Sequence, residues 1–208
     1  MKASELIAVA LAEIGYVGKK TNDQLDDPAA NPGGKYTKYA RDLNIAGYYN
    51  GNKNGYDYCT VFCDWCFFKT ANCDKTAAML VKPVSIYGAS VGYIKCMFPP
   101  ERIGKGIDAM PGDQLVFNNG TPGKLLHTGL VKTVDRKTMT LTTIEGNITD
   151  DHCVGVRTYS LTDPKIDFLV HPYYEEDYIK ISTTEYKQLK EEAVAFRTIR
   201  SLINGNIS

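Results

Sequence analysis

The sequence predicts an α+β fold, in which N-terminal helices pack on a curved antiparallel sheet and another helix follows at the C-terminus. Helical patterns fill the first half of the chain, whereas short alternating strands begin at Gln114. Links of only a few residues join these strands, and short links favour antiparallel pairing. A length of 208 residues suits one well-buried domain with a short appendage. We place the main domain at residues 1–176 and a helical appendage at residues 177–208.

The first helix begins close to the N-terminus. Ser4 is its expected N-cap, and Ile7, Leu11 and Ile14 are spaced to face inward. The apolar run there is short and has no convincing cleavage site, which favours this helix over a secretion signal. We therefore expect the protein in the cytoplasm of the cell that makes it.

Two further helices follow, separated by polar loops over residues 17–35 and 47–55. A short helix is expected at residues 37–43 and a longer one at about residues 59–70, with Asp57 at the position of its N-cap. The longer helix should bury three aromatic side chains, those of Phe62, Trp65 and Phe68.

The second half of the chain changes to strands. One or two more helices over residues 76–98 end at the pair Pro99-Pro100. Turn residues then separate five alternating runs. These predicted strands cover residues 115–117, 127–134, 138–144, 154–159 and 168–171.

A capping box, Ser182 to Glu185, opens the C-terminal helix over about residues 182–203. Apolar residues recur along it at steps of four and three. This helix can dock on the main domain, form a homodimer with a second copy, or lead to another partner, and the sequence leaves these alternatives open.

Bulk composition excludes several kinds of partner. The chain has 24 basic and 24 acidic residues, so no strong field points to nucleic acid or to an anionic membrane. No stretch is long and apolar enough to span a bilayer. We expect no nucleic-acid partner and no membrane insertion.

Cys59 stands at the start of the 59–70 helix and is the candidate nucleophile. Unpaired amides and the macrodipole at a helix N-terminus favour a thiolate, and the same amides can receive an oxyanion. Cys63, Cys66 and Cys73 lie further along, where the dipole effect fades, and are expected to be buried structural cysteines. The six cysteines do not form a recognisable disulfide framework.

His127 opens an apolar strand, where a histidine is an unusual choice for packing alone, and Gly129 leaves room for an approaching group. It is the candidate general base toward Cys59 and the later general acid. Glu145 and Asn147 share a face of the next predicted strand, because residues i and i+2 point the same way. A hairpin places that strand beside His127, so these two residues are the candidate orienters.

Together these segments resemble the CHAP domain, the cysteine- and histidine-dependent amidohydrolase/peptidase group of the papain-like NlpC/P60 superfamily. The resemblance covers roughly residues 4–172. It is carried by Tyr36-Thr-Lys-Tyr39, Cys59 with Phe62, Trp65 and Cys66, Pro111-Gly-Asp-Gln-Leu-Val-Phe117, His127-Thr-Gly-Leu-Val131 and Ile144-Glu-Gly-Asn147. It implies a papain-like fold in which Cys59 is the nucleophile, His127 the base, Glu145 the residue that orients the base, and Asn147 a fourth polar member.

The resemblance also implies a reaction. Family members hydrolyse amide bonds of bacterial peptidoglycan, either between muramic acid and L-alanine or within the peptide stem and bridge. Many are phage endolysins, which accumulate in the host cytoplasm without a signal and act at the wall after release. Peptidoglycan is therefore the expected partner, and we expect neither a metal nor an organic cofactor.

Two departures from the family pattern lie just before the nucleophile. Tyr58 stands where the family usually has Trp or another large residue, which is a mild change. Some relatives bind calcium through acidic residues there, whereas this chain has Asn50, Asn52 and Asn54. Without carboxylates, and with Val61 where such a loop needs its bidentate Glu, a calcium site would be very weak.

Two rival interpretations remain. Cys59, Cys63 and Cys66 have the Cys-x3-Cys-x2-Cys spacing of radical S-adenosylmethionine enzymes, whose thiolates hold an iron–sulfur cluster. Those enzymes need a parallel barrel, which conflicts with helices followed by antiparallel strands. The second rival interpretation is a catalytically inactive module that binds the wall or forms part of a virion. The presence of the complete Cys, His, Glu and Asn set argues against it.

Overall fold

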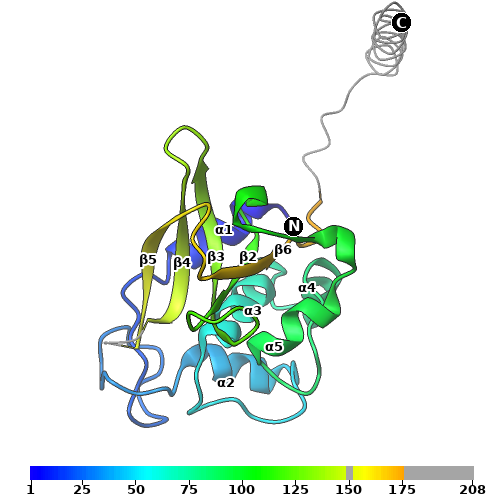
Figure 1. Cartoon of the computed structure of the whole chain (residues 1–208). Coiled ribbons are helices and arrows are strands. Elements are labelled where there is room, and N and C mark those ends of the chain that lie inside the picture. Colours follow the sequence, from blue (N-terminus) through cyan, green and yellow to red (C-terminus); the bar gives the residue numbers. More distant parts are fainter. Residues whose placement is uncertain (149–151, 176–208) are drawn as a thin grey trace, which may run out of the picture. The chain divides into compact units, whose positions relative to one another are not determined.

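The computed structural model of the chain describes residues 1–148 and 152–175 (Figure 1). Met1–Tyr174 forms one compact unit. The predicted helix over residues 182–203 and its pairing lie outside the described residues, so the boundary at residue 176 stays a prediction. No helix within the described ranges has the length and apolar character needed to cross a bilayer.

Helices come first along the described chain, as predicted. They are α1 (Ala3–Leu11), α2 (Lys38–Ile45), α3 (Cys59–Thr70), α4 (Lys75–Val81) and α5 (Val91–Ile94). Three short 3-10 turns follow, η1 (Lys95–Met97), η2 (Pro100–Arg102) and η3 (Gly106–Asp108). The 59–70 helix has the predicted bounds.

Helix α1 faces the core with a side that differs in part from the predicted one, since Ile7 packs against the core as predicted. Leu6 and Ala10 are fully buried. Two residues predicted to face inward are exposed, Leu11 and Ile14. Ile14 lies beyond α1, which ends at Leu11, so the helical stripe cannot include it. Leu11 follows the buried Ala10 and lies at the edge of the inward face. The N-cap is Lys2 rather than Ser4, and the backbone N–H of Lys2 donates to Glu5 Oε2 at 2.7 Å.

The strands form one antiparallel sheet in the order β1-β6-β2-β3-β4-β5 among the described residues. They are β1 (Ile103–Gly104), β2 (Gln114–Asn118), β3 (Leu125–Asp135), β4 (Thr140–Ile148), β5 (Cys153–Ser160) and β6 (Ile166–Val170). The five predicted strands correspond to β2–β6, whereas β1 is too short to show an alternating pattern. Strands β2–β5 pair in chain order, but β6 returns to the far side of β2. The α+β prediction is confirmed.

Helix α3 is the centre of the main core. It contacts α1, α2 and α4 as well as strands β3 and β4 (Figure 1). Every residue from Cys59 to Phe68 is buried, including the three aromatic side chains predicted to be so. A helix that is buried all round needs apolar residues on every face, and the sequence of α3 meets that condition.

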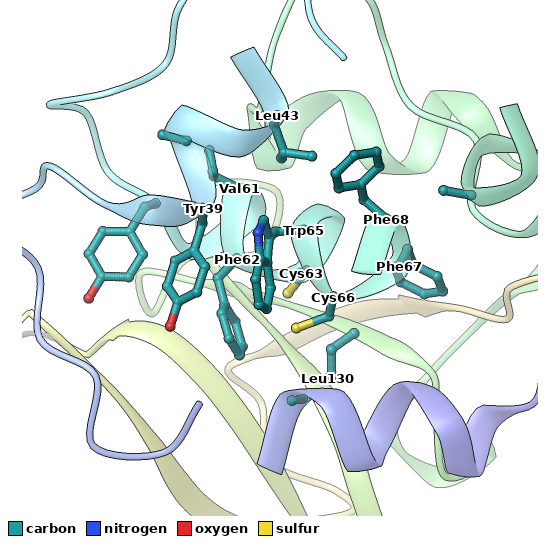
Figure 2. Close-up of a cluster of buried hydrophobic side chains, with 14 of the residues drawn as sticks. Tyr39, Leu43, Val61, Phe62, Cys63, Trp65, Cys66, Phe67, Phe68 and Leu130 are labelled. Carbon is teal, nitrogen blue, oxygen red and sulfur yellow. The ribbon is translucent and has the colours of Figure 1, made fainter. Parts of the chain in front are cut away.

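Two cysteines of α3 belong to this core. Figure 2 shows the sulfur atoms of Cys63 and Cys66 among aromatic side chains, on the side of α3 toward Leu130 of β3. Burial raises the pKa of both thiols well above its usual value, which makes them structural rather than reactive. Cys73 was wrongly predicted to be buried: α3 ends at Thr70, and Cys73 is exposed in the turn that follows. Among the described residues, no cysteine forms a disulfide bond.

Candidate active site

Cys59 is the first residue of helix α3 and only 6% exposed. The amide of Phe62 donates to the carbonyl of Tyr58 at 2.7 Å. The amides that precede Phe62 in this first turn therefore have no acceptor within the helix. They can bind negative charge next to the Cys59 sulfur.

Asp57 does not cap helix α3, contrary to the prediction. The N-cap is Tyr58, and its side chain makes no capping bond. The Asp57 carboxylate is drawn away because Lys35 pairs with it at 2.7 Å and Asn147 donates to it at 3.0 Å. The bond to Lys35 is the main cause that lowers the pKa of Asp57.

His127 lies on β3 opposite Phe117 of β2, and the two rings stack with their centroids 6.0 Å apart. Its Nε2 is 2.9 Å from Glu145 Oε2, which leaves Nδ1 as the ring nitrogen for the Cys59 thiol. Burial lowers the pKa of His127, but hydrogen bonds to Cys59 and Glu145 outweigh burial and raise the pKa to about 9. The imidazole therefore holds its proton at neutral pH.

Glu145 is buried and held by three partners. Besides His127, it accepts hydrogen bonds at Oε1 from the Thr143 hydroxyl and, at 3.0 Å, from the Tyr159 hydroxyl. Its side chain passes over Gly129, where an added Cβ would lie 2.5 Å from Glu145 Cγ. The room that the sequence leaves at Gly129 is thus filled by the carboxylate that orients His127.

A close approach of β4 to α3 brings the carboxylate strand to the nucleophile helix. A Cβ at Gly146 would lie 2.6 Å from the Cβ of Phe62. Only glycine allows the two backbones to come so near. Glu145 is thereby placed beside the first turn of the helix that begins with Cys59.

Asn147 lies at the same cleft but does not contact His127. Its backbone has a φ of 60°, and the register between β4 and β5 shifts between Glu145 and Ile148. The expectation that Asn147 and Glu145 share a strand face is therefore wrong. The Asn147 amide joins Asp57 to His152, whose Nδ1 is 2.8 Å from Asn147 Oδ1.

All four predicted site residues, Cys59, His127, Glu145 and Asn147, line one cleft of about 430 Å³. The structure adds lining residues that sequence reasoning missed. Among them are Phe117, Leu126, Arg157, Tyr159 and Lys165. For Arg157 and Tyr159 the sequence could have predicted a shared location, because residues two apart in a strand such as β5 lie on the same face.

The described residues contain no group of three or more His, Cys, Asp or Glu side chains that could hold a metal ion. Two of the asparagines before α3 accept hydrogen bonds from backbone amides of the protein. Asn54 Oδ1 accepts the amide of Thr37 at 2.8 Å, and Asn52 Oδ1 accepts the amide of Asn54 at 2.8 Å. Both oxygens serve to shape the loop.

The iron–sulfur interpretation conflicts with the fold. Cys63 and Cys66 lie inside an α-helix and are fully buried, whereas cluster ligands are thiolates. The sheet around them is antiparallel and not a parallel barrel. Only Cys59 of the three lines the cleft.

Comparison with known proteins gives a family. Residues 49–147 match the family model of the CHAP domain. No curated protein matches the chain. A solved structure described as "The crystal structure of Ly7917" is similar at 13% identity with a TM-score of 0.46, over 83% of this chain and 63% of that one. The chain thus spans less than two thirds of the length of that structure.

The matched segment contains Cys59, His127, Glu145 and Asn147, the residues that meet at the cleft. Residues 49–147 are thus matched to the CHAP domain, which is in the NlpC/P60-like cysteine/histidine amidohydrolase/peptidase group.

Proposed function

We propose that the protein hydrolyses an amide bond of bacterial peptidoglycan by acyl transfer through a thioester at Cys59. One observation carries this proposal. The Cys59 thiol, the His127 imidazole and the buried Glu145 carboxylate follow one another at a single open cleft. A nucleophile, a base and a group that orients the base are the parts that such chemistry needs.

The reaction has two halves. The Cys59 sulfur attacks the carbonyl carbon of the amide, and amides of the first turn of α3 receive the negative oxygen. His127 gives its proton to the leaving amine as the C–N bond breaks, which leaves a thioester. His127 then takes a proton from water, whose oxygen attacks the thioester, and the acid product and the thiolate are released. Glu145 keeps the ring in place throughout.

In this proposal the protein acts as a phage endolysin, made in the host cytoplasm and delivered to the wall after release. The resemblance to CHAP endolysins supports this role. The bond is either the one between muramic acid and L-alanine or one within the peptide. Mass analysis of digested wall fragments would identify it, because an amidase and an endopeptidase leave different new termini.

A turbidity assay on bacterial cell walls tests the enzymatic proposal. We expect the wild type to clear the suspension and Cys59→Ala to have no activity. Cys73→Ala is the matched control, because Cys73 is exposed and does not line the cleft. If Cys59→Ala clears walls as fast as the wild type, or if the wild type clears no wall tested, the proposal is wrong. The second result would favour an inactive wall-binding or structural module.

A further inference from the structure

Two cations line the active-site cleft beyond the catalytic residues. They are Arg157 of β5 and Lys165, which precedes β6. Both are exposed, and neither forms an ion pair with any residue that the structure describes. The described residues therefore leave the positive charge of these two side chains without an ion pair.

The acidic residues of the cleft are already engaged. Asp57 pairs with Lys35 at 2.7 Å, and Glu145 pairs with His127 at 2.9 Å. Neither carboxylate has a contact with Arg157 or Lys165 among the ion pairs of the described chain. Among the described residues that line the cleft, an incoming anion would thus meet two cations without an ion pair and no carboxylate without one.

The register of the sheet places Arg157 near Glu145, the residue that binds the catalytic base. Arg157 pairs with Thr143 of β4 and shares a strand face with Tyr159, two residues on. Thr143 and Tyr159 are the two residues whose hydroxyls bind Glu145. The guanidinium side chain therefore leaves the sheet from the same neighbourhood as the carboxylate that orients His127.

Lys165 is fixed on another side of the cleft. Its carbonyl accepts the amide of Asn118 at 2.9 Å, which ties it to the end of β2. The residue before Asn118 is Phe117, whose ring stacks on His127. Two consecutive segments of the chain, β5 and the turn before β6, thus contribute one cation each to the cleft that His127 lines.

The same cleft has apolar lining. Phe117 and Ile148 contribute to it, as does Leu126, which is 65% exposed. Apolar surface combined with two free cations suits a peptide that has small aliphatic side chains and a nearby negative group.

We propose that Arg157 and Lys165 form an anion subsite, which binds a free carboxylate of the substrate peptide close to the scissile amide. This inference rests on the proposed function and specifies its substrate. A phosphodiester of a wall polymer would present the same charge, but the cleft must already hold a peptide at Cys59. A carboxylate of that same peptide reaches the subsite without a second molecule.

The test uses two synthetic muramoyl-peptides that contain the severed bond. One has a free carboxylate on the residue next to that bond, and the other has a carboxamide there. We would measure KM and kcat of the full-length wild type, Arg157→Gln and Lys165→Gln on both peptides. Lys137→Gln is the matched control, because Lys137 lies in the turn between β3 and β4 and does not line the cleft.

We expect the wild type to have the lower KM for the carboxylate peptide. Each Gln variant should raise that KM about two- to fivefold, the usual effect of one exposed charge pair, and leave kcat and the carboxamide KM unchanged. Arg157→Lys should recover part of the loss, and salt should shrink the difference. Equal KM values of the wild type for both peptides, or equal increases on both, would overturn the subsite.

Two more measurements separate the possible failures. Calorimetry would measure the affinity of each peptide for Cys59→Ala, which tests the subsite without catalysis. Tighter binding of the carboxylate peptide supports the subsite, and equal affinity overturns it. If the wild type cleaves neither peptide nor any wall, the proposed function fails on its own. If the variants differ from wild type only on walls that contain phosphodiester polymers, the subsite recognises phosphate and the carboxylate proposal is wrong.

Discussion

Glu145 connects the catalytic base to the surrounding sheet. One oxygen faces His127 Nε2 at 2.9 Å, and the other accepts from Tyr159 at 3.0 Å and from Thr143. A buried carboxylate is stable only when its lone pairs are satisfied. The two hydroxyls therefore fix the direction in which the carboxylate meets the imidazole, and Tyr159 is a positioning residue.

Replacing Tyr159 with Phe removes the hydrogen bond to Glu145 and hardly changes the volume of the side chain. We expect kcat to fall about tenfold, which corresponds to about 1.4 kcal/mol for a lost bond to a charged group, while KM stays close to the wild-type value. Steady-state kinetics on a defined wall peptide would check this. Tyr87→Phe, at an exposed tyrosine outside the cleft, should be silent. A Tyr159→Phe enzyme with wild-type kcat would contradict the positioning role.

The protonation of His127 gives a second prediction. Its pKa is raised to about 9, against about 6.5 in an unfolded chain. Protonation of His127 therefore stabilises the folded state. This contribution to the free energy of unfolding is complete below pH 6.5 and is lost as the pH rises toward 9. Activity should fall over the same upper range, because the imidazole loses the proton that it gives to the leaving amine.

An NMR titration of the His127 ring would check the origin of this shift. In Cys59→Ala the pKa should be lower than in the wild type, since bonds to Cys59 are among its main raising causes. Cys73→Ala should leave the value unchanged. The same pKa in wild type and Cys59→Ala would mean that the thiol and the imidazole do not interact.

At the scale of elements, two glycines control how β4 meets its neighbours. Gly146 lets β4 approach α3 at Phe62, and Gly129 of β3 leaves space for the Glu145 side chain. Neither contact can be read from the alternation of either strand. Both determine whether three catalytic side chains on three elements meet.

Gly129→Ala should therefore damage activity more than stability. The new methyl group would lie 2.5 Å from Glu145 Cγ, so the carboxylate must move and His127 loses its orientation. We expect kcat to fall at least about tenfold, with a change in thermal midpoint of a few degrees. Gly92→Ala is the control, because the nearest atom to its added Cβ is 3.6 Å away. A fully active Gly129→Ala would show that Glu145 tolerates displacement.

For the whole molecule, a buried charge pair joins segments that are distant in sequence. Lys82, just after α4, pairs with Asp64 of α3, and Tyr49 donates to the same carboxylate. The side chains of Lys82 and Asp64 are each only 2% exposed. Together these residues hold the loop after α2 and the end of α4 against the central helix.

Lys82→Met should lower the free energy of unfolding by about 3–5 kcal/mol, because the Asp64 carboxylate then stays buried without its partner. Adding Asp64→Asn should recover much of that loss, since no charge then remains. Urea unfolding of the single and double variants would measure both values, with Lys137→Met as a surface control. Additive losses in the double variant would mean that the two charges do not interact.

Local patterns predicted much of the fold. The bounds of α3, its burial on all sides and the antiparallel strands β2–β5 follow from apolar spacing and turn residues, which act over a few neighbouring positions. The prediction for the inward face of α1 was right for Ile7 and wrong for Ile14, because the helix ends at Leu11, earlier than the apolar pattern. The return of β6 to β2 was not predicted, since pairing between distant strands leaves no local mark.

The sequence by itself determined the chemistry: a cysteine at a helix start, a histidine on a strand and a glutamate on the next strand, with a hairpin that makes the strands neighbours. Only the tertiary structure decided which side chains support them. It turned Asn147 toward Asp57 and His152 through a backbone with positive φ, and it brought Tyr159, Arg157 and Lys165 to the cleft. Such contacts depend on strand register and close approach of backbones, which are set by packing across the whole core rather than by neighbours in the chain.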